Sequence, residues 1–323
     1  MTKKSILFSF LLFTSFQLIS QPVSHFEIDI VNSKKHDVKY ITEKITEIEL
    51  KGTVNYSDYS IWDLMISDKY IYVIVARNGG SDYKLLLFNE NRHFLKEILT
   101  LSDGIPRFIS DQKSPDIYIH SGNKVIHYDP EKNLQKEYYF EDDDKSIMSL
   151  LYHDKLFWGI SVKIANDSSY EYEFFCSNNP SLREKTPLYS YSYTQSDNLR
   201  AFPYARFSLA VNNLYLGFGF ENKIYTVSDR GFSSVTTYNF KNSKPSPEWQ
   251  YFGWQGRIGN YICIMLKDFN NLFFYDVRNG ESFILQQDKK ISIRFCNIED
   301  HIYYTENSKR EKGLPIIYLI KLK

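Results

Sequence analysis

Short runs of β-branched and aromatic residues, separated by clusters of turn-forming residues, recur along most of the chain. The stretch 61–99 shows the unit clearly, because residues 70–75 and 84–88 are apolar runs with Gly, Asn, Asp and Ser residues between them. Such runs between such clusters are typical of β-strands joined by tight turns. Nothing in this stretch sustains a 3.6-residue apolar period, so the pattern predicts strands rather than helices.

The unit occurs six times in one order. A turn followed by an apolar–aromatic pair marks the second strand of each copy, as DKYIY, SPDIY, DKLFW, VNNLY, GNYIC and EDHIY. A third strand follows each of them, as KLLLFNEN, KVIHYDPE, YEFFCSNN, KIYTVSDR, NLFFYDVR and PIIYLIKL. A spacing of about 40 to 50 residues is the period of a β-propeller blade. We therefore predict an all-β fold, a six-bladed β-propeller of four-stranded antiparallel blades.

The sixth copy contains only three strands before the chain ends at Lys323. Residues 45–50 alternate apolar and polar but belong to no copy. We predict that they supply the outer strand of the last blade, because an open ring would leave two unpaired sheet edges. The predicted single domain spans residues 21–323, with a lead-in at 21–57 and blades at about 58–100, 101–141, 145–195, 201–241, 249–287 and 290–323.

Two local patterns stand out within the lead-in. Residues 26–30 alternate in the manner of a strand, and residues 36–44 are compatible with a short helical turn. Neither pattern has a counterpart in the six copies.

The N-terminus has the pattern of a secretory signal peptide, which we place at residues 1–20. Lys3 and Lys4 form its charged start, residues 6–19 its apolar core, and Ser20 is a small residue before the cleavage point. The apolar run is shorter than the ~20 residues that span a bilayer, so we expect no stable membrane span after cleavage. An uncleaved anchor is the alternative. The pattern predicts a periplasmic or secreted protein.

The composition of the chain gives little indication of its function. The chain has 39 basic and 39 acidic residues and a formal net charge of zero, which argues against a broad nucleic-acid-binding surface. Its 26 Tyr and 24 Phe fit closely stacked sheets. Three cysteines give no disulfide framework, so we expect buried thiols at Cys176, Cys263 and Cys296. A Cys263–Cys296 bridge is the alternative for an exported protein.

These features together resemble a known family. The exported N-terminus, the single alternating strand before the first blade and the copies seen as DKYIY/KLLLFN and SPDIY/KVIHYD resemble the exported six-bladed β-propeller proteins of Gram-negative bacteria. They are similar, more distantly, to the NHL-type and TolB-like propellers. The resemblance covers about residues 26–323 and implies the fold and export, but it implies no reaction. Members are often lipid-anchored, and this chain has no cysteine near the cleavage point.

Familiar catalytic and metal-binding motifs are absent from the sequence. The seven histidines form neither HExxH nor a His–Cys cluster, and the chain has no GxSxG, no P-loop and no GxGxxG after a strand. His120 and His127 flank a predicted hairpin, and paired surface histidines are the ordinary interpretation. We therefore expect no metal and no cofactor, and we favour a protein without catalytic activity.

The first strands of the blades offer a candidate site, because in a propeller they line the central channel. An arginine precedes a phenylalanine in three of them, IPRFIS, YARFSL and SIRFCN, which contain Arg107, Arg206 and Arg294. Arg257 lies nearby in WQGRIG, and Asp63 occupies the corresponding position in blade one. An arginine cluster would suit carboxylate, sulfate or phosphate groups of a ligand. The alternative is that each arginine pairs with a neighbouring carboxylate or carbonyl, or lies between sheets.

The connection between blades four and five suggests a second surface. Its sequence, PSPEWQYFGWQGR, contains Trp249, Tyr251 and Trp254, which is more aromatic than an ordinary loop. Aromatic platforms stack on sugar rings or anchor a protein partner. The alternative is that these rings fill the channel or wedge between blades.

The sequence thus predicts an exported, non-enzymatic binding or scaffold protein that holds a glycan, peptide or protein partner at one end of the channel. The alternative is a periplasmic hydrolase or lyase acting on an anionic glycan, with the arginines positioning its carboxylates. A carboxylate or histidine with a perturbed pKa beside them would favour the enzyme. A flat aromatic face without such a group would favour binding. The ligand and the oligomeric state stay open.

Overall fold

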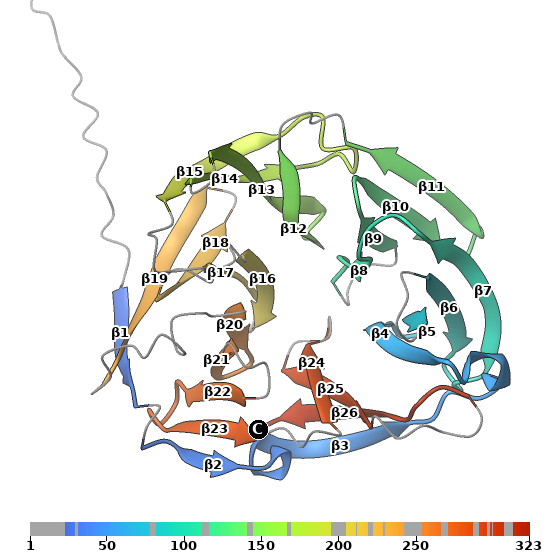
Figure 1. The fold of residues 1–323 in the computed structure, drawn as a ribbon, viewed down its shortest axis with the longest axis horizontal. Coiled ribbons are helices and arrows are strands. Elements are labelled where there is room, and N and C mark those ends of the chain that lie inside the picture. The colour runs from blue at the N-terminus through green and yellow to red at the C-terminus, as the bar shows by residue number, and fades with distance from the viewer. Residues whose placement is uncertain are drawn as a thin grey trace, which may run out of the picture.

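Six β-sheets surround one axis, and the chain passes through them in order (Figure 1). The predicted six-bladed β-propeller is therefore confirmed. A computed structural model of the chain describes residues 23–29, 32–77, 82–111, 116–140, 145–166, 169–194, 205–210, 212–218, 222–228, 230–241, 254–265, 271–286, 291–295, 298, 300–306 and 313–323.

Each blade begins with its innermost strand and continues outward. The strands of blades one to three are β4 (Tyr59–Ile66), β5 (Tyr70–Arg77), β6 (Tyr83–Asn89) and β7 (Phe94–Leu101); β8 (Arg107–Phe108), β9 (Ile117–Ser121), β10 (Lys124–Asp129) and β11 (Leu134–Tyr139); β12 (Ser146–His153), β13 (Leu156–Asn166), β14 (Ser169–Ser177) and β15 (Thr186–Thr194). Those of blades four to six are β16 (Ala205–Ala210), β17 (Asn213–Phe218), β18 (Lys223–Ser228) and β19 (Gly231–Phe240); β20 (Trp254–Ile258), β21 (Tyr261–Met265), β22 (Asn271–Asp276) and β23 (Ser282–Gln286); β24 (Ile291–Phe295), β25 (His301–Glu306) and β26 (Ile317–Leu322).

The last blade is completed by an N-terminal strand, as predicted. β3 (Thr42–Ile48) pairs antiparallel with β26, so that Ile48 lies opposite Ile317 and Ile45 opposite Ile320. Ile48 is 4% exposed and is the buried residue of β3, whereas Ile45 is 39% exposed. The early part of the chain therefore fastens the sheet formed by the end of the chain, and this edge of blade six is covered.

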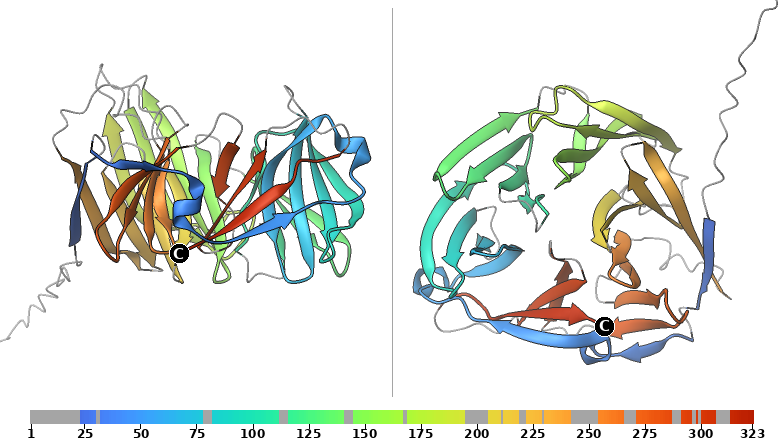
Figure 2. Two further views of the ribbon diagram at one scale, coloured as in Figure 1. Left: turned by 90° about the horizontal axis from the view of Figure 1, so that it is seen from below. Right: turned by 180° about the vertical axis from the view of Figure 1, so that it is seen from behind.

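Two further N-terminal strands add to the blades before the closing one, and the sequence did not assign them to blades. β1 (Val23–Ile28) pairs parallel with β19, and β2 (Lys34–His36) pairs parallel with β23, so blades four and five have five strands. Figure 2 shows these blue strands on the outside of the ring. The predicted helical turn is present as the 3₁₀ turn η1 (Val38–Ile41), and a second turn, η2 (Val54–Tyr56), precedes blade one.

The last residue of the third strand caps the turn that follows it in blades one to five, which explains why these five strands end in Asn, Asp or Ser. The side chain of Asp129 accepts hydrogen bonds from the backbone N–H groups of Glu131 and Lys132, each at 3.0 Å. Asp, Asn and Ser side chains favour such turns because they mimic a backbone acceptor. Caps of this kind are formed by Asn89, Asp129, Ser177, Ser228 and Asp276.

Glycines allow the closest approaches between strands. A Cβ atom on Gly217 of β17 would lie 2.4 Å from the carbonyl oxygen of Gln255 on β20, in the next blade. Gln255 is fully buried there, where it accepts a hydrogen bond from the Tyr238 hydroxyl and donates one to the Phe218 carbonyl. Blades four and five are therefore joined by a contact that has no room for a side chain at position 217.

Two of the three cysteines are buried free thiols, as expected. Cys176 is 9% exposed and Cys263 is fully buried, and burial raises the pKa of the Cys263 thiol. Cys263 is thus not bridged, and Cys296 lies outside the described residues.

The predicted signal peptide, residues 1–20, also lies outside the part of the chain that the structure describes. Among the described residues, no helix has the length and apolar character needed to cross a bilayer.

Candidate functional site

A cavity of about 460 Å³ lies on the propeller axis, bounded by residues from all six blades. Most of its wall comes from the innermost strands, as expected for a propeller channel. Its size is typical of small-molecule sites. The ionisable residues that line it are Asp63, Arg107, His120, Arg206 and His301.

Two of the predicted arginines line this cavity, and each lies over an aromatic ring. The guanidinium carbon of Arg107 is 4.7 Å from the centre of the Trp62 ring, and that of Arg206 is 5.8 Å from the centre of the Phe295 ring. The Trp62 indole N–H donates to the carbonyl of Pro106 at 3.1 Å, which fixes the ring. Cation–π contacts at these distances are attractive and limit where the guanidinium can lie.

Two guanidiniums and one carboxylate are among the described residues that line the cavity. Burial, followed by the like charge of Arg107, lowers the pKa of Arg206 to about 10, while the charge of Asp63 opposes the shift. Arg206 therefore remains protonated at neutral pH. Two half-buried guanidiniums beside one carboxylate are a suitable arrangement for binding an anionic group.

Asp63 holds the inner strands of blades one and two together. Its carboxylate oxygens accept one backbone N–H each, from Leu64 at 2.9 Å and from Phe108 at 3.0 Å. Burial raises the pKa of the Asp63 carboxyl, and the charge of Arg107 opposes this shift. Because both oxygens already accept backbone hydrogen bonds, Asp63 has the structural role of joining these two inner strands.

The other two predicted arginines are held by contacts at the seams between blades. Arg294 donates to the backbone carbonyl of Trp62, and its guanidinium carbon lies 5.2 Å from the centre of that ring. Arg257 donates to the Tyr215 hydroxyl at 3.1 Å and to the Gly259 carbonyl at 3.3 Å. Neither is among the described residues that line the cavity. A role in ligand binding stays a prediction for both.

The aromatic connection between blades four and five cannot be placed in this geometry. Trp249 and Tyr251 lie outside the described residues. Trp254 begins β20, where its backbone lies opposite Met265. The aromatic platform stays a prediction.

The sequence did not identify Trp62 or His120 as part of the channel site. Trp62 directly precedes Asp63 in the first strand of blade one. Its position next to a predicted site residue was the only indication in the sequence that it lies near the channel. His120 lies opposite Arg107 in the register of blade two, and its Nε2 is 3.1 Å from the Gly122 carbonyl. Burial lowers the pKa of His120, so this imidazole is neutral at neutral pH.

His120 and His127 do not form a joint site. His127 stacks on Tyr118 with ring centres 4.7 Å apart, and its Nε2 lies 3.2 Å from Asp116, whereas His120 faces the cavity. No group of three or more His, Cys, Asp or Glu side chains within the described residues is arranged to hold a metal ion.

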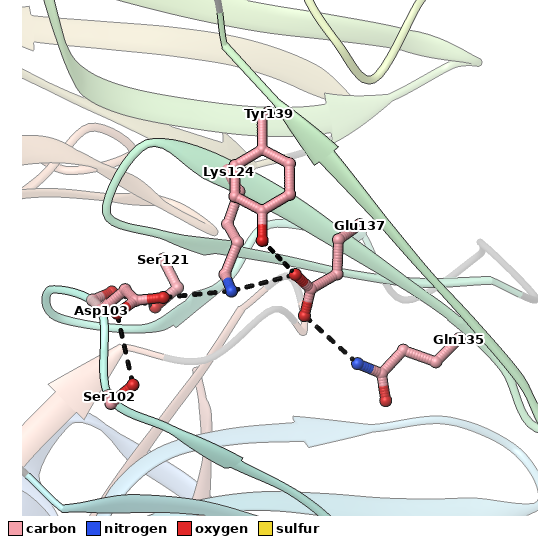
Figure 3. Close-up of polar contacts among 7 residues, drawn as sticks. All are labelled: Ser102, Asp103, Ser121, Lys124, Gln135, Glu137 and Tyr139. Carbon is pink, nitrogen blue, oxygen red and sulfur yellow. Dashed lines mark hydrogen bonds and ion pairs between the residues drawn. The ribbon is translucent and has the colours of Figure 1, made fainter.

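A second charged cluster lies in blade two (Figure 3). Lys124 is 9% exposed, and its ammonium group lies between Asp103 at 3.2 Å and Glu137 at 3.1 Å. The Tyr139 hydroxyl donates to Glu137 at 2.6 Å. Blade one repeats the pair at the same positions of its third and fourth strands, with Lys84 3.0 Å from Glu97. Because blades one and two both contain the pair, we assign it to sheet stability and not to ligand binding.

Tyr139→Phe should lower the melting temperature at pH 7 by about 1–2 °C. The Tyr139 hydroxyl, ahead of Lys124, holds the pKa of Glu137 below its usual value. A carboxylate whose pKa is lowered by folding stabilises the folded state at pH values above its usual pKa. This stabilisation is lost as the pH falls through the pKa of the folded state. The difference from the unmodified protein should therefore shrink below about pH 4. Thermal melts from pH 3 to 7 test this, with Tyr138→Phe as the control, and a pH-independent difference would contradict it.

Comparisons with known proteins support the fold. No family model and no curated protein matches the chain. A solved structure of a Bacteroides fragilis protein described as exported is similar, with a TM-score of 0.60, 11% identity, and coverage of 94% of this chain and 100% of that one. At this identity the likeness shows the fold alone.

Two other solved structures match less well. A Bacteroides thetaiotaomicron protein of unknown function has a TM-score of 0.47 and 12% identity, covering 85% of this chain and 75% of that one. Ycf48 bound to a D1 peptide has a TM-score of 0.45 and 10% identity, covering 90% of this chain and 98% of that one. From the sheet topology and the Bacteroides fragilis match, the chain is a six-bladed β-propeller closed by a strand from its N-terminal region.

Proposed function

We propose that the protein is an exported, non-catalytic binding protein that holds an anionic group of its ligand in the axial cavity. The observation that carries this proposal is the pair of guanidiniums, Arg107 and Arg206, which line the cavity from different blades and lie over aromatic rings. Asp63 is the single carboxylate among the described lining residues. Acidic glycans, peptides and protein partners all carry groups that such guanidiniums bind.

Export rests on the N-terminal pattern. Lys3 and Lys4, the apolar run 6–19 and Ser20 follow the order of a secretory signal peptide. A periplasmic or secreted location follows from that pattern.

A hydrolase or lyase acting on an anionic glycan is the second candidate, because Asp63 and His120 both line the cavity and both have perturbed pKa values. A general acid or base must reach the proton that it transfers. The Asp63 carboxyl is 8% exposed, and its oxygens accept backbone hydrogen bonds, which leaves it poorly placed for this task. Incubation with acidic oligosaccharides should yield no products, and turnover that is lost in Asp63→Asn would support the enzyme instead.

Arg107→Gln and Arg206→Gln should each weaken binding of an anionic ligand by about tenfold or more, because a hydrogen bond to a charged group contributes roughly 1.5–3 kcal/mol. Raising the salt concentration should weaken binding to the unmodified protein. A thermal-shift screen of acidic oligosaccharides, acidic peptides and small carboxylates identifies a ligand, and calorimetric titration then measures its affinity.

The matched control is Arg230→Gln, since Arg230 is exposed in a turn of blade four away from the cavity lining. It should bind as the unmodified protein does. Equal affinity in the Arg107, Arg206 and Arg230 variants would contradict the proposed function.

A further inference from the structure

Arg107 has hydrogen-bond donors that no protein group uses, unlike two other arginines near the channel. Arg257 and Arg294 donate to protein oxygens at the seams between blades. The Arg107 guanidinium lies over the Trp62 ring, and within the described part of the chain it donates no hydrogen bond. Its five N–H groups form a planar fork, from which a carboxylate can accept two hydrogen bonds at once. The fork of Arg107 is therefore available to a carboxylate in the cavity.

His120 is the neighbour of Arg107 on the adjacent strand of blade two. The two residues lie directly opposite each other where β8 pairs with β9, and both line the cavity. Residues that face each other on antiparallel strands have Cβ atoms about 5 Å apart and project from the same face of the sheet. One small ligand can therefore contact both side chains.

The hydrogen bond of His120 determines which ring nitrogen carries the proton. Its Nε2 lies 3.1 Å from the carbonyl oxygen of Gly122, and because a carbonyl can only accept, Nε2 carries the hydrogen. Burial lowers the pKa of His120, so the ring is neutral at neutral pH and its Nδ1 has an unprotonated lone pair. Among the described residues, none donates a hydrogen bond to this Nδ1. The cavity therefore has a hydrogen-bond acceptor beside the donors of Arg107.

We propose that the ligand is an α-hydroxycarboxylate, whose carboxylate accepts hydrogen bonds from Arg107 while its hydroxyl group donates one to Nδ1 of His120. This inference rests on the proposed function and narrows it to one class of anion. The carboxylate and the hydroxyl group of such a molecule are on adjacent carbon atoms, which matches the facing positions of the donor and the acceptor. An α-amino acid would place an ammonium group beside the Arg107 guanidinium, where like charges repel. We therefore assign a hydroxyl group and not an amine.

Calorimetric titration of the purified protein with four small probes tests the inference. Lactate has both groups, propionate lacks the hydroxyl group, lactamide lacks the charge, and alanine has an ammonium group in place of the hydroxyl group. We expect lactate to bind about tenfold more tightly, or better, than each of the other three. The reason is that a site built to form a hydrogen bond loses affinity for an analogue that leaves its polar group unpaired.

Variants of His120 separate recognition of the hydroxyl group from a structural role. His120→Phe should remove most of the preference for lactate over propionate, while propionate binds as it does to the unmodified protein, which also shows that the variant is folded. His120→Gln is the second variant and should keep much of the preference, because its amide can donate to Gly122 and offer an oxygen to the ligand. His93→Phe is the matched control, because His93 is exposed and does not line the cavity.

The outcomes distinguish this inference from the proposed function. If propionate binds as tightly as lactate and both depend on Arg107, the α-hydroxycarboxylate is wrong and the anion site stands. The same conclusion follows if alanine binds as tightly as lactate, or if the preference for lactate survives in His120→Phe. If no anionic probe binds in an Arg107-dependent manner, both proposals fall.

Discussion

Ile48→Asp should lower the free energy of unfolding by about 4 kcal/mol or more and prevent stable closure of the ring. Ile48 is 4% exposed on the closing strand β3 and packs in one apolar cluster with Val73, Tyr303 and Ile317. That cluster joins blade six to blade one, so an aspartate would place an unpaired carboxylate in the seam where the ring closes. Urea unfolding followed by circular dichroism measures the loss.

Ile45→Asp is the matched control on the same strand. Ile45 is 39% exposed, so its aspartate variant should lose less than about 1 kcal/mol. If the two variants lose equal stability, or if Ile48→Asp unfolds at the same urea concentration as the unmodified protein, β3 does not fasten the ring as described.

Gly217→Ala should have the second-largest effect, a loss of about 3 kcal/mol. The added methyl group would lie 2.4 Å from the carbonyl oxygen of Gln255 and 2.6 Å from its Cγ atom. The first of these atoms belongs to the backbone of β20, so a side-chain rotation cannot relieve the contact. Blades four and five would have to separate, which would also disturb the hydrogen bonds of the buried Gln255 side chain.

Thermal and urea unfolding of the Gly217→Ala protein test this seam. Lys223→Ala is the control, because Lys223 is exposed on the neighbouring strand β18 of the same blade. It should stay within about 0.5 kcal/mol of the unmodified protein. A Gly217→Ala variant as stable as the control would show that the two blades do not approach each other in this way.

The repeat and the ring closure were predictable because both leave local signals in the sequence. Each blade repeats a turn and an apolar run, and β3 alternates apolar and polar residues without belonging to a copy. The parallel strand β2 was not predictable in the same way. It is only three residues long, Lys34–His36, with two exposed lysines, so backbone hydrogen bonds to β23 and not apolar burial hold it in place.

The candidate site was predictable only in part. The position of an inner strand identifies which residues are near the axis, and Arg107 and Arg206 were found in this way. Whether a long side chain points into the cavity or along a seam depends on its neighbours in other blades. Arg257 donates a hydrogen bond to the hydroxyl of Tyr215, 42 positions earlier in the chain, and no local sequence pattern indicates that contact.

Trp62 was missed for a related reason. The Arg107 and Arg294 side chains that contact its ring come from blades two and six, so its role depends on how three blades meet. The sequence shows only that Trp62 adjoins Asp63.

The most direct test of the closed ring is a disulfide between Thr46→Cys on β3 and Leu319→Cys on β26, which lie opposite each other in the register. Facing residues on antiparallel strands are close enough for such a bond, so we expect the pair to oxidise readily and to lose two free thiols. The single variants and a mismatched pair, Thr46→Cys with Thr100→Cys on β7, should stay reduced. A Thr46–Leu319 pair that remains reduced while the mismatched pair forms a bond would contradict the ring closure described above.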